Sequence, residues 1–402
     1  MVEYREYAEL QNSPHSERRG QAARIAAQAW LNHDGSESER AALYASLLGF
    51  LDDASVRVRA ALAYELLHSK DAPRPVMFAL AQDAPIIARA VAQYSPVLLE
   101  TDLLSLARSA DIELRLTIID RDNVSPALAA ALVDAGERAI DRALVQRPDI
   151  PLAAADLVTL ADRWADDVQM RGLLLERQDL PAVARYLLVD RVVEALGRVR
   201  IVRGSVDGKR LGRLTRDAVD RATTSLAEEE IAEGRQQLIE ALIDAGRLST
   251  RLIIHALISG RVVFFAAAVA LLSEMPANRV LGILGDGRRN ALNAVFARCG
   301  FAEGLWSVLA RLVTAARETD LGEDLAARHA VVAALIEDMI AEYEGDIPAD
   351  LRPVFGYLNE QNVSLARAAA RGVMASFIEQ APEDHAMAAV SFRDHRPALP
   401  AA

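Results

Sequence analysis

Apolar residues recur every three to four positions along much of this chain, which is the spacing of one buried face on an α-helix. One such stripe consists of Val56, Ala60, Ala63 and Leu67. Three further stripes follow prolines, and they comprise Leu128 and Leu132 after Pro126, Leu152, Leu157 and Leu160 after Pro151, and Val183 and Leu187 after Pro181. The pattern predicts an all-α protein.

Two short motifs separate these stripes at a regular interval. The first motif reads Asp-x-x-aliphatic-Arg and starts at Asp53, Asp111 and Asp167, with degenerate copies at Asp83 and Asp134. The second motif reads Arg-x-(Asp or Asn)-aliphatic-(Pro or Ser) and starts at Arg121, Arg147 and Arg177, which lie 26 and 30 residues apart. Self-similarity at such a period is typical of helical-repeat arrays.

Both motifs carry residues that favour helix ends. The aspartate of the first motif is expected to cap a helix, because its carboxylate accepts hydrogen bonds from backbone N–H groups that lack a partner inside the helix. The second motif is expected to open the partner helix, with Asp149 or Asp179 as the cap and Pro151 or Pro181 in the first turn.

The arginines of the first motif have two interpretations. The structural one is a series of ion pairs between neighbouring repeats, interrupted in the Asp83 copy because Ile87 replaces the arginine there. The functional one is that some of these arginines line a concave groove and bind an acidic partner. The candidate binding residues in the repeats are Arg57, Arg115 and Arg171.

Two resemblances rest on these residues. The run Asp53-x-x-Val56-Arg57, followed by alanines at 60, 61 and 63, resembles the HEAT-type helical repeat. The Arg-x-Asp-Leu-Pro turns and the segment from Arg261 to Pro276 are similar to an alphaproteobacterial family of uncharacterised proteins, known only as a domain of unknown function. The similarity covers roughly residues 20–345. It implies a HEAT-like α-α superhelix (a solenoid) followed by a second helical domain, and it implies no reaction.

The composition supports closely packed helices and sets the electrostatic background. Hydrophobic residues make up 52% of the 402 residues but aromatic residues only 5%, so alanine, leucine and valine supply most of the core. The formal net charge of -12 opposes duplex DNA or an anionic membrane as a partner, although a local basic patch can override it. The single cysteine, Cys299, excludes an internal disulfide and favours a reducing compartment.

No targeting or membrane segment is predicted. The first residues lack the basic-then-apolar order of a signal peptide. The longest apolar run, Val262 to Leu272, is shorter than the roughly 20 residues that cross a bilayer and is expected to be the core helix of the second domain. A cytoplasmic location is the resulting expectation.

The segment 197–214 divides the chain into two parts. It is rich in glycine, arginine and lysine, and Asp207 is its single acidic residue, so we predict a basic linker or long loop. Its candidate partner-binding residues are Arg198, Arg200, Arg203, Lys209 and Arg210. The predicted organisation is an N-terminal helical cap (1–40), HEAT-like repeats (41–196), this junction (197–214), a second helical domain (215–345), and a short helix with a disordered tail (346–402).

Local signals predict several elements of the second domain. Ser225 has capping-box spacing to Glu228, Ser249 is expected to open a helix, and Gly246 and Gly260 are expected to end helices. Further helices are expected at 321–343 and 365–378. The segment 276–300 has the dimensions of a helix-turn-helix around Gly285, with side-chain types that read bases or phosphates. Those side chains are Arg288, Arg289, Asn290, Asn293 and Arg298.

The sequence carries no recognisable catalytic motif. No two histidines have the i, i+4 spacing of a helical metal site, and His255 is expected to be a hydrogen-bonded core residue. We therefore predict no cofactor and no metal. The leading hypothesis is a non-enzymatic scaffold that binds a protein or peptide along the repeat groove, with a homodimer as a further option and no membrane partner. The alternatives are a nucleic-acid-binding protein, using the junction or the Gly285 hairpin, and an enzyme with a cleft between the two halves.

Overall fold

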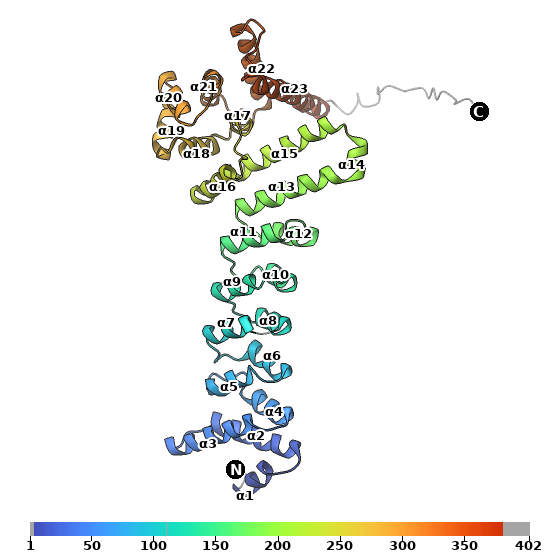
Figure 1. The fold of residues 1–402 in the computed structure, drawn as a ribbon, viewed down its shortest axis with the longest axis vertical. Coiled ribbons are helices and arrows are strands. Elements are labelled where there is room, and N and C mark those ends of the chain that lie inside the picture. Colours follow the sequence, from blue (N-terminus) through green and yellow to red (C-terminus); the bar gives the residue numbers. More distant parts are fainter. Residues whose placement is uncertain (1–3, 110, 381–402) are drawn as a thin grey trace, which may run out of the picture. The chain divides into compact units, whose positions relative to one another are not determined.

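The computed structural model describes residues 4–109 and 111–380, and every regular element within them is a helix, so the all-α prediction is confirmed. The predicted disordered tail beyond residue 380 lies outside the described residues. The chain forms two compact units, which divide between Val192 and Val193 (Figure 1).

Unit 1 is built from helices that alternate between two layers (Figure 1). The first layer contains α3, which contacts α5, and α7, α9 and α11, which contact in series. The second layer is an unbroken series of contacts from α2 through α4, α6, α8 and α10 to α12. The helices are α1 (Tyr4–Gln11), α2 (Ser16–Leu31), α3 (Glu37–Leu51), α4 (Val56–Leu66), α5 (Arg74–Leu80), α6 (Pro85–Tyr94), α7 (Glu100–Ser109), α8 (Ile112–Ile119), α9 (Pro126–Asp134), α10 (Arg138–Val145), α11 (Ala154–Arg163), α12 (Val168–Glu176) and the start of α13 (Ala182–Arg198).

The core of unit 1 follows two of the four predicted stripes, those after Pro126 and Pro151. Leu128, Leu132, Leu157 and Leu160 are each at most 1% exposed. In α4 the stripe is displaced, because Val58, Leu62 and Leu66 are fully buried while Val56 is 39% exposed.

The stripe predicted after Pro181 is also displaced. Ala182, Ala184 and Leu188 are buried there, whereas Val183 and Leu187 are only half-buried. Small residues such as these alanines allow neighbouring helix backbones to approach closely.

Some predicted helix starts are confirmed and others are wrong. The Asp111 side chain accepts from Leu114 N, and that of Asp167 from Gln169 N and Met170 N, as predicted. Ser125, for which the sequence predicts no cap, accepts from Leu128 N at the start of α9. Asp53 does not cap α4, because its Oδ1 accepts from the N–H of Ser55, which holds the cap position itself.

The aspartates of the second motif do not cap helices. Asp149 and Asp179 each bind the arginine two residues earlier. Asp134 is the last residue of α9 rather than the start of a helix. Pro151 precedes the first residue of α11 by three positions, so it lies outside the first turn of that helix.

Unit 2 contains the remaining helices. They are α14 (Arg200–Ser205), α15 (Gly208–Glu229), α16 (Ala232–Asp244), α17 (Thr250–Ile258), α18 (Val262–Ser273), α19 (Ala277–Asp286), α20 (Arg289–Arg298), α21 (Glu303–Glu318), α22 (Leu325–Glu342) and α23 (Arg352–Gln380). The helix α18 is the predicted core helix, since Phe264 and Phe265 are fully buried. Gly246 and Gly260 adopt positive φ after α16 and α17, and Ser249 caps α17, as predicted.

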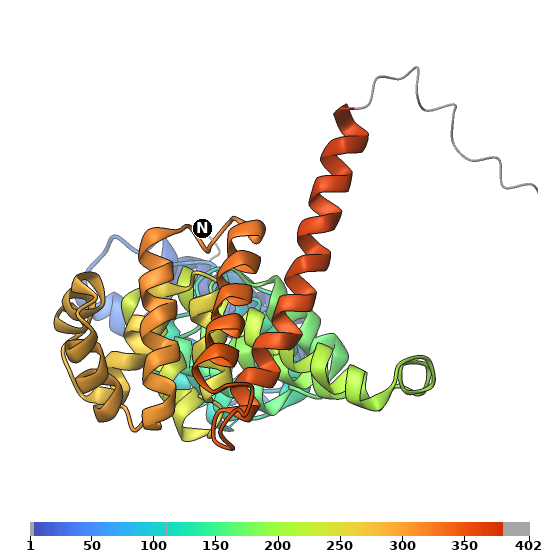
Figure 2. The ribbon, with the colours of Figure 1, turned by 90° about the horizontal axis from the view of Figure 1, so that it is seen from above.

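Three predictions for unit 2 are corrected. Residues 197–214 are helical rather than a loop, because the end of α13, α14 and the start of α15 occupy them (Figure 2). Ser225 lies inside α15 and not at a cap. The helix expected at 365–378 is the second part of the much longer α23.

Candidate partner-binding surfaces

The arginines of the second motif bind backbone carbonyls one repeat earlier. Arg121 donates to the carbonyl oxygens of Ala92, Gln93 and Ser95 at the end of α6. Each such arginine follows one second-layer helix and reaches the C-terminal end of the preceding one. Carbonyls there have no partner inside their helix and carry partial negative charge, so a guanidinium both satisfies and stabilises them.

The same contact recurs at the next two copies. Arg147 Nη1 lies 2.9 Å from Ile119 O, at the end of α8. Arg177 donates to the carbonyl oxygens of Val145, Arg147 and Ile150 at 3.1–3.4 Å, around the end of α10. We call Arg121, Arg147 and Arg177 the fastening arginines. These contacts between neighbouring repeats account for the arginine of the motif, so no catalytic role is needed to explain it.

The third position of the motif supplies a counter-charge. Arg147 Nε is 2.8 Å from Asp149 Oδ1, and this hydrogen bond holds the pKa of Asp149 below its usual value. Arg177 is bound in the same way by Asp179. Arg121 has Asn123 at that position, and burial lowers the pKa of its guanidinium.

A second series of ion pairs joins the N-terminal ends of the second-layer helices. Each arginine meets a carboxylate at the start of the next helix in the layer. The pairs are Arg19–Asp53 (2.7 Å), Arg59–Asp83 (2.6 Å), Arg89–Glu113 (3.8 Å), Arg115–Glu137 (2.7 Å) and Arg138–Asp167 (2.8 Å). The hydrogen bonds from Arg19, Arg59 and Arg138 hold the pKa values of Asp53, Asp83 and Asp167 below their usual range.

The predicted series therefore exists, but of its three expected arginines only Arg115 takes part in it. Arg59 takes the place expected for Arg57, and Arg138 pairs with Asp167 in place of Arg171. The gap expected at Ile87 is absent, because Arg89, two residues further along α6, approaches Glu113. One helical turn offers two or three positions that reach the neighbouring helix, so the motif spacing did not identify the pairing residue.

The three candidate binding arginines of unit 1 have different surroundings. Arg57 is exposed on α4. Arg115 is half-buried and binds Glu137 and the carbonyls of Ala107 and Arg108. Arg171 is half-buried and donates to Ala165 O at 2.7 Å. Arg57 is thus the one of the three whose guanidinium faces solvent.

Exposed aliphatic side chains mark the same edge of the second layer. In α4, α6, α8 and α12 an aliphatic residue in the first helical turn faces solvent, and we call these residues the aliphatic row. They are Val56 (39% exposed), Ile86 (73%), Ile112 (44%) and Val168 (72%). The predictions had placed Val56 in the core, so the row was missed.

Charge also distinguishes the two layers. The helices α4, α6, α8, α10 and α12 contain seven arginines and four carboxylates, whereas α3, α5, α7, α9 and α11 contain four arginines and seven carboxylates. Within their bounds the second-layer helices are therefore the more basic ones, whereas the carboxylates that precede them at this edge, such as Asp83 and Asp167, are paired with arginines.

The basic residues of the former junction lie on helices. Arg198, Arg200, Lys209 and Arg210 are exposed, whereas the side chain of Arg203 lies outside the described residues. Arg198 approaches Glu194 at 3.7 Å. These residues belong to a segment that we call the basic arm (residues 196–216).

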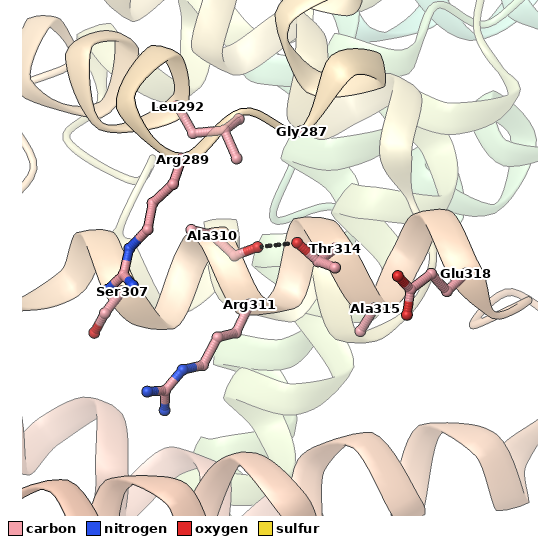
Figure 3. Close-up of a pocket in the computed structure, with 9 residues that line it drawn as sticks. All are labelled: Gly287, Arg289, Leu292, Ser307, Ala310, Arg311, Thr314, Ala315 and Glu318. Atoms are coloured by element: carbon pink, nitrogen blue, oxygen red, sulfur yellow. Dashed lines mark hydrogen bonds between the residues drawn. The ribbon is translucent and has the colours of Figure 1, made fainter.

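The Gly285 hairpin is only partly available for binding. Its turn is made by Gly287 at φ 65°, Arg298 donates to Ser273 O, and Arg288, Arg289 and Asn290 are exposed. Asn293 is half-buried. A cavity of about 320 Å³ separates α20 from α21, and Figure 3 shows Arg289 extending toward Ser307 on its wall. Arg311 on that wall is paired with Glu342 at 2.9 Å, so its positive charge is largely neutralised by that carboxylate.

A buried polar network crosses unit 2. Arg251 of α17 binds Asp217 and Asp220 of α15 and lies 4.5 Å above the ring of Tyr357 in α23. His255, 6% exposed, has Nδ1 2.7 Å from Tyr357 Oη, which confirms it as a hydrogen-bonded core histidine. Burial, and then the nearby arginines led by Arg221, lower the pKa of His255 to about 4. The network ties three helices together.

This network predicts a pH dependence. The pKa of His255 lies below its unfolded value of 6.5, so the unfolded chain binds the extra proton and unit 2 is expected to lose stability as pH falls from 6.5 towards 4. The total is about 3 kcal/mol, at roughly 1.4 kcal/mol per pH unit. Chemical denaturation of wild type and His255→Gln over this range measures it. Equal slopes for the two proteins would show that His255 is not held neutral.

The remaining chemistry is sparse. Within residues 4–109 and 111–380 no three His, Cys, Asp or Glu side chains are grouped to hold a metal ion. Burial raises the pKa of the Cys299 thiol to about 11, so the reactive thiolate is disfavoured. Among the described helices, no single helix is long and apolar enough to cross a membrane. The helices α18 and α19, which meet at a bend of 118°, are together long and apolar enough to do so, although much of α18 is buried.

Comparison with known proteins gives one match. The profile of a family described as "Uncharacterised protein conserved in bacteria (DUF2336)" matches residues 87–347, which is more than half of the chain. No curated protein and no solved structure matches.

Proposed function

We propose that this chain, which belongs to that family of uncharacterised bacterial proteins, is a non-enzymatic scaffold that binds an acidic peptide or protein segment along the aliphatic row of unit 1. A HEAT-like solenoid in unit 1, an alphaproteobacterial origin and a cytoplasmic location are parts of the same proposal. The alternation of helices between two layers supports the solenoid, because each repeat contacts mainly its neighbours in such an array. Repeat arrays of this kind have extended surfaces that they use for binding.

The aliphatic row is the observation that carries the proposal. Stacked helices lie roughly 10 Å apart, and an extended chain advances about 3.3 Å per residue. One extended segment can therefore contact α4, α6 and α8 with about every third residue. It would reach α12 after about twice that interval, because α10 has no exposed large aliphatic side chain. Exposed arginines such as Arg57 and Arg142 lie on the same helices, so acidic residues between the apolar ones would be favoured.

Selection from a random peptide library tests this proposal. Wild-type protein is expected to enrich peptides with acidic residues and an aliphatic residue about every third position. The double variant Ile86→Ser and Val168→Ser is expected to bind an enriched peptide at least tenfold more weakly, because two apolar contacts are lost. Both side chains are more than 70% exposed, so the fold should not change.

A matched control is Ile201→Ser in unit 2, which is 79% exposed and should leave peptide binding unchanged. Enrichment of no peptide, or equal binding by the double variant, would contradict the proposal.

Nucleic-acid binding is the second candidate, and the exposed Arg198, Arg200, Lys209 and Arg210 favour it. A fluorescent unstructured oligonucleotide is then expected to bind at low salt, with an affinity that falls steeply as salt rises. No binding at low salt would exclude it.

A further inference from the structure

The basic arm is a helical segment in which none of the described side chains is buried. This holds from Leu196 to Arg216, although the segment runs through the end of α13, all of α14 and the first turns of α15. Helices in globular proteins normally bury one face. A stretch of this length without such a face indicates a surface that awaits a partner.

Charge in the arm opposes that of the whole chain. Residues 196–216 contain seven arginines and lysines and one acidic residue, Asp207, in a protein of net charge -12. Asp207 is used locally, since it caps α15 by accepting from Arg210 N. Among the described residues no ion pair joins Arg200, Lys209 or Arg210 to a carboxylate, and Arg213 approaches Glu360 only at 3.7 Å.

Aliphatic side chains are exposed between these cations. They are Leu196 (47% exposed), Val199 (44%), Ile201 (79%) and Leu214 (53%). Arg210 and Leu214 are four residues apart and therefore share one face of α15. Within unit 2, α14 lies at the end of α15 that is far from α16 (Figures 1 and 2), so the tip of the arm projects from the rest of the unit.

This combination distinguishes between anionic partners. Nucleic acids would satisfy the arginines but leave the aliphatic side chains in water, and the arm has no aromatic residue on which bases could stack. The boundary between phospholipid headgroups and acyl chains accepts both, because arginine binds the phosphates while leucine, isoleucine and valine enter the apolar layer. Clusters of four to eight basic residues on such helices are typical of binding to anionic lipid.

We propose that the basic arm binds the surface of an anionic phospholipid bilayer. The arm lies on the membrane and does not cross it. This local patch overrides the repulsion expected from the net charge, since charges beyond about one Debye length of 8–10 Å are screened at physiological salt. Unit 1 and its aliphatic row have no part in this contact. Failure of bilayer binding would therefore not affect the proposal of peptide binding, and the reverse also holds.

Vesicle sedimentation of the full chain tests the proposal. Wild type is expected to sediment with vesicles of phosphatidylcholine and phosphatidylglycerol (3:1) at about 0.1 M salt, where the Debye length is about 10 Å, and not with pure phosphatidylcholine. A triple variant of the arm is expected to bind at least tenfold more weakly; it combines Arg200→Glu, Lys209→Glu and Arg210→Glu. The matched control Arg18→Glu, Arg24→Glu and Arg288→Glu has the same charge change at exposed positions elsewhere, and it should keep most of the binding.

A second variant separates a bilayer from other partners. Ile201→Ser with Leu214→Ser keeps the charge and is expected to reduce vesicle binding several-fold, while Ile86→Ser with Val168→Ser has no effect. Absence of wild-type sedimentation, or equal binding by the arm and control charge variants, overturns the proposal. Oligonucleotide binding that the charge variant loses and the aliphatic variant keeps, without vesicle binding, would instead identify nucleic acid as the partner.

Discussion

Replacement of Arg177 by alanine is expected to lower the free energy of unfolding of unit 1 by about 2–6 kcal/mol, because two buried carbonyl oxygens lose their hydrogen-bond donor. The Arg177 side chain is 2% exposed and donates to three carbonyl oxygens and to both oxygens of Asp179. Asp179 is 47% exposed and can be hydrated after the change. The carbonyls of the buried Val145 and Ile150 cannot, and each unsatisfied buried group costs about 1–3 kcal/mol.

Hydrogen exchange locates this loss. Repeat arrays couple mainly to nearest neighbours, so faster exchange is expected in α10 and α12 and little change in α2 and α4. Arg142→Ala is the matched control, because Arg142 is exposed on α10 and its removal should change stability by less than about 0.5 kcal/mol. Equal effects of the two substitutions would show that the fastening arginines do not hold the repeats together.

Gly260→Ala is expected to destabilise unit 2 by about 2–5 kcal/mol, from a left-handed backbone and an overpacked contact. Gly260 has φ 68°, and a β-carbon added there would lie 2.5 Å from Gly322 N and 2.7 Å from the carbonyl carbon of Leu321. Both neighbours are backbone atoms, which cannot move aside as a flexible side chain does. The turn after α17 and the segment before α22 must therefore separate.

Gly246→Ala separates the cost of the left-handed backbone from the cost of the close contact. Gly246 has φ 63° but no atom within 4 Å of an added β-carbon, so only the backbone penalty of about 1–2 kcal/mol is expected. Chemical denaturation followed by the fluorescence of Trp306, the tryptophan of unit 2, measures both variants. A Gly260→Ala variant no less stable than Gly246→Ala would exclude close packing at this turn.

Features that depend on local chemistry were predictable from the sequence. Asp111 and Asp167 cap helices because their short side chains reach nearby N–H groups, and Gly246 and Gly260 end helices because they tolerate positive φ. These interactions involve residues only a few positions apart, so spacing alone defines them.

Features that depend on contacts between helices were not predictable. The pairing of Arg59 with Asp83 in place of Arg57 is decided by which residue of one turn faces the next helix. The junction was predicted to be a loop from its glycines, but each glycine costs a helix only about 1 kcal/mol. Its leucines, arginines and lysine favour helix, and the second half of α15, which buries Thr223, Thr224 and Ala227, extends it.

The binding surfaces were missed for a related reason. An aliphatic residue in the first turn of a helix has the same sequence pattern whether it faces the core or solvent. Val56 was predicted as core, yet the layer places it on the edge with Ile86 and Val168. Only the series of contacts from α4 through α6, α8 and α10 to α12 shows that these exposed residues lie along one edge.

Site-specific photo-crosslinking in bacterial cells tests the central claim most directly. A crosslinking amino acid would replace Ile86, Ile112 or Val168 in the aliphatic row, or the exposed Ala41 of α3 in the first layer. The account predicts that the three row positions crosslink to one partner, at points that advance steadily along a single acidic segment, and that Ala41 does not. Crosslinks from Ala41 alone, or no shared partner among the row positions, would contradict it.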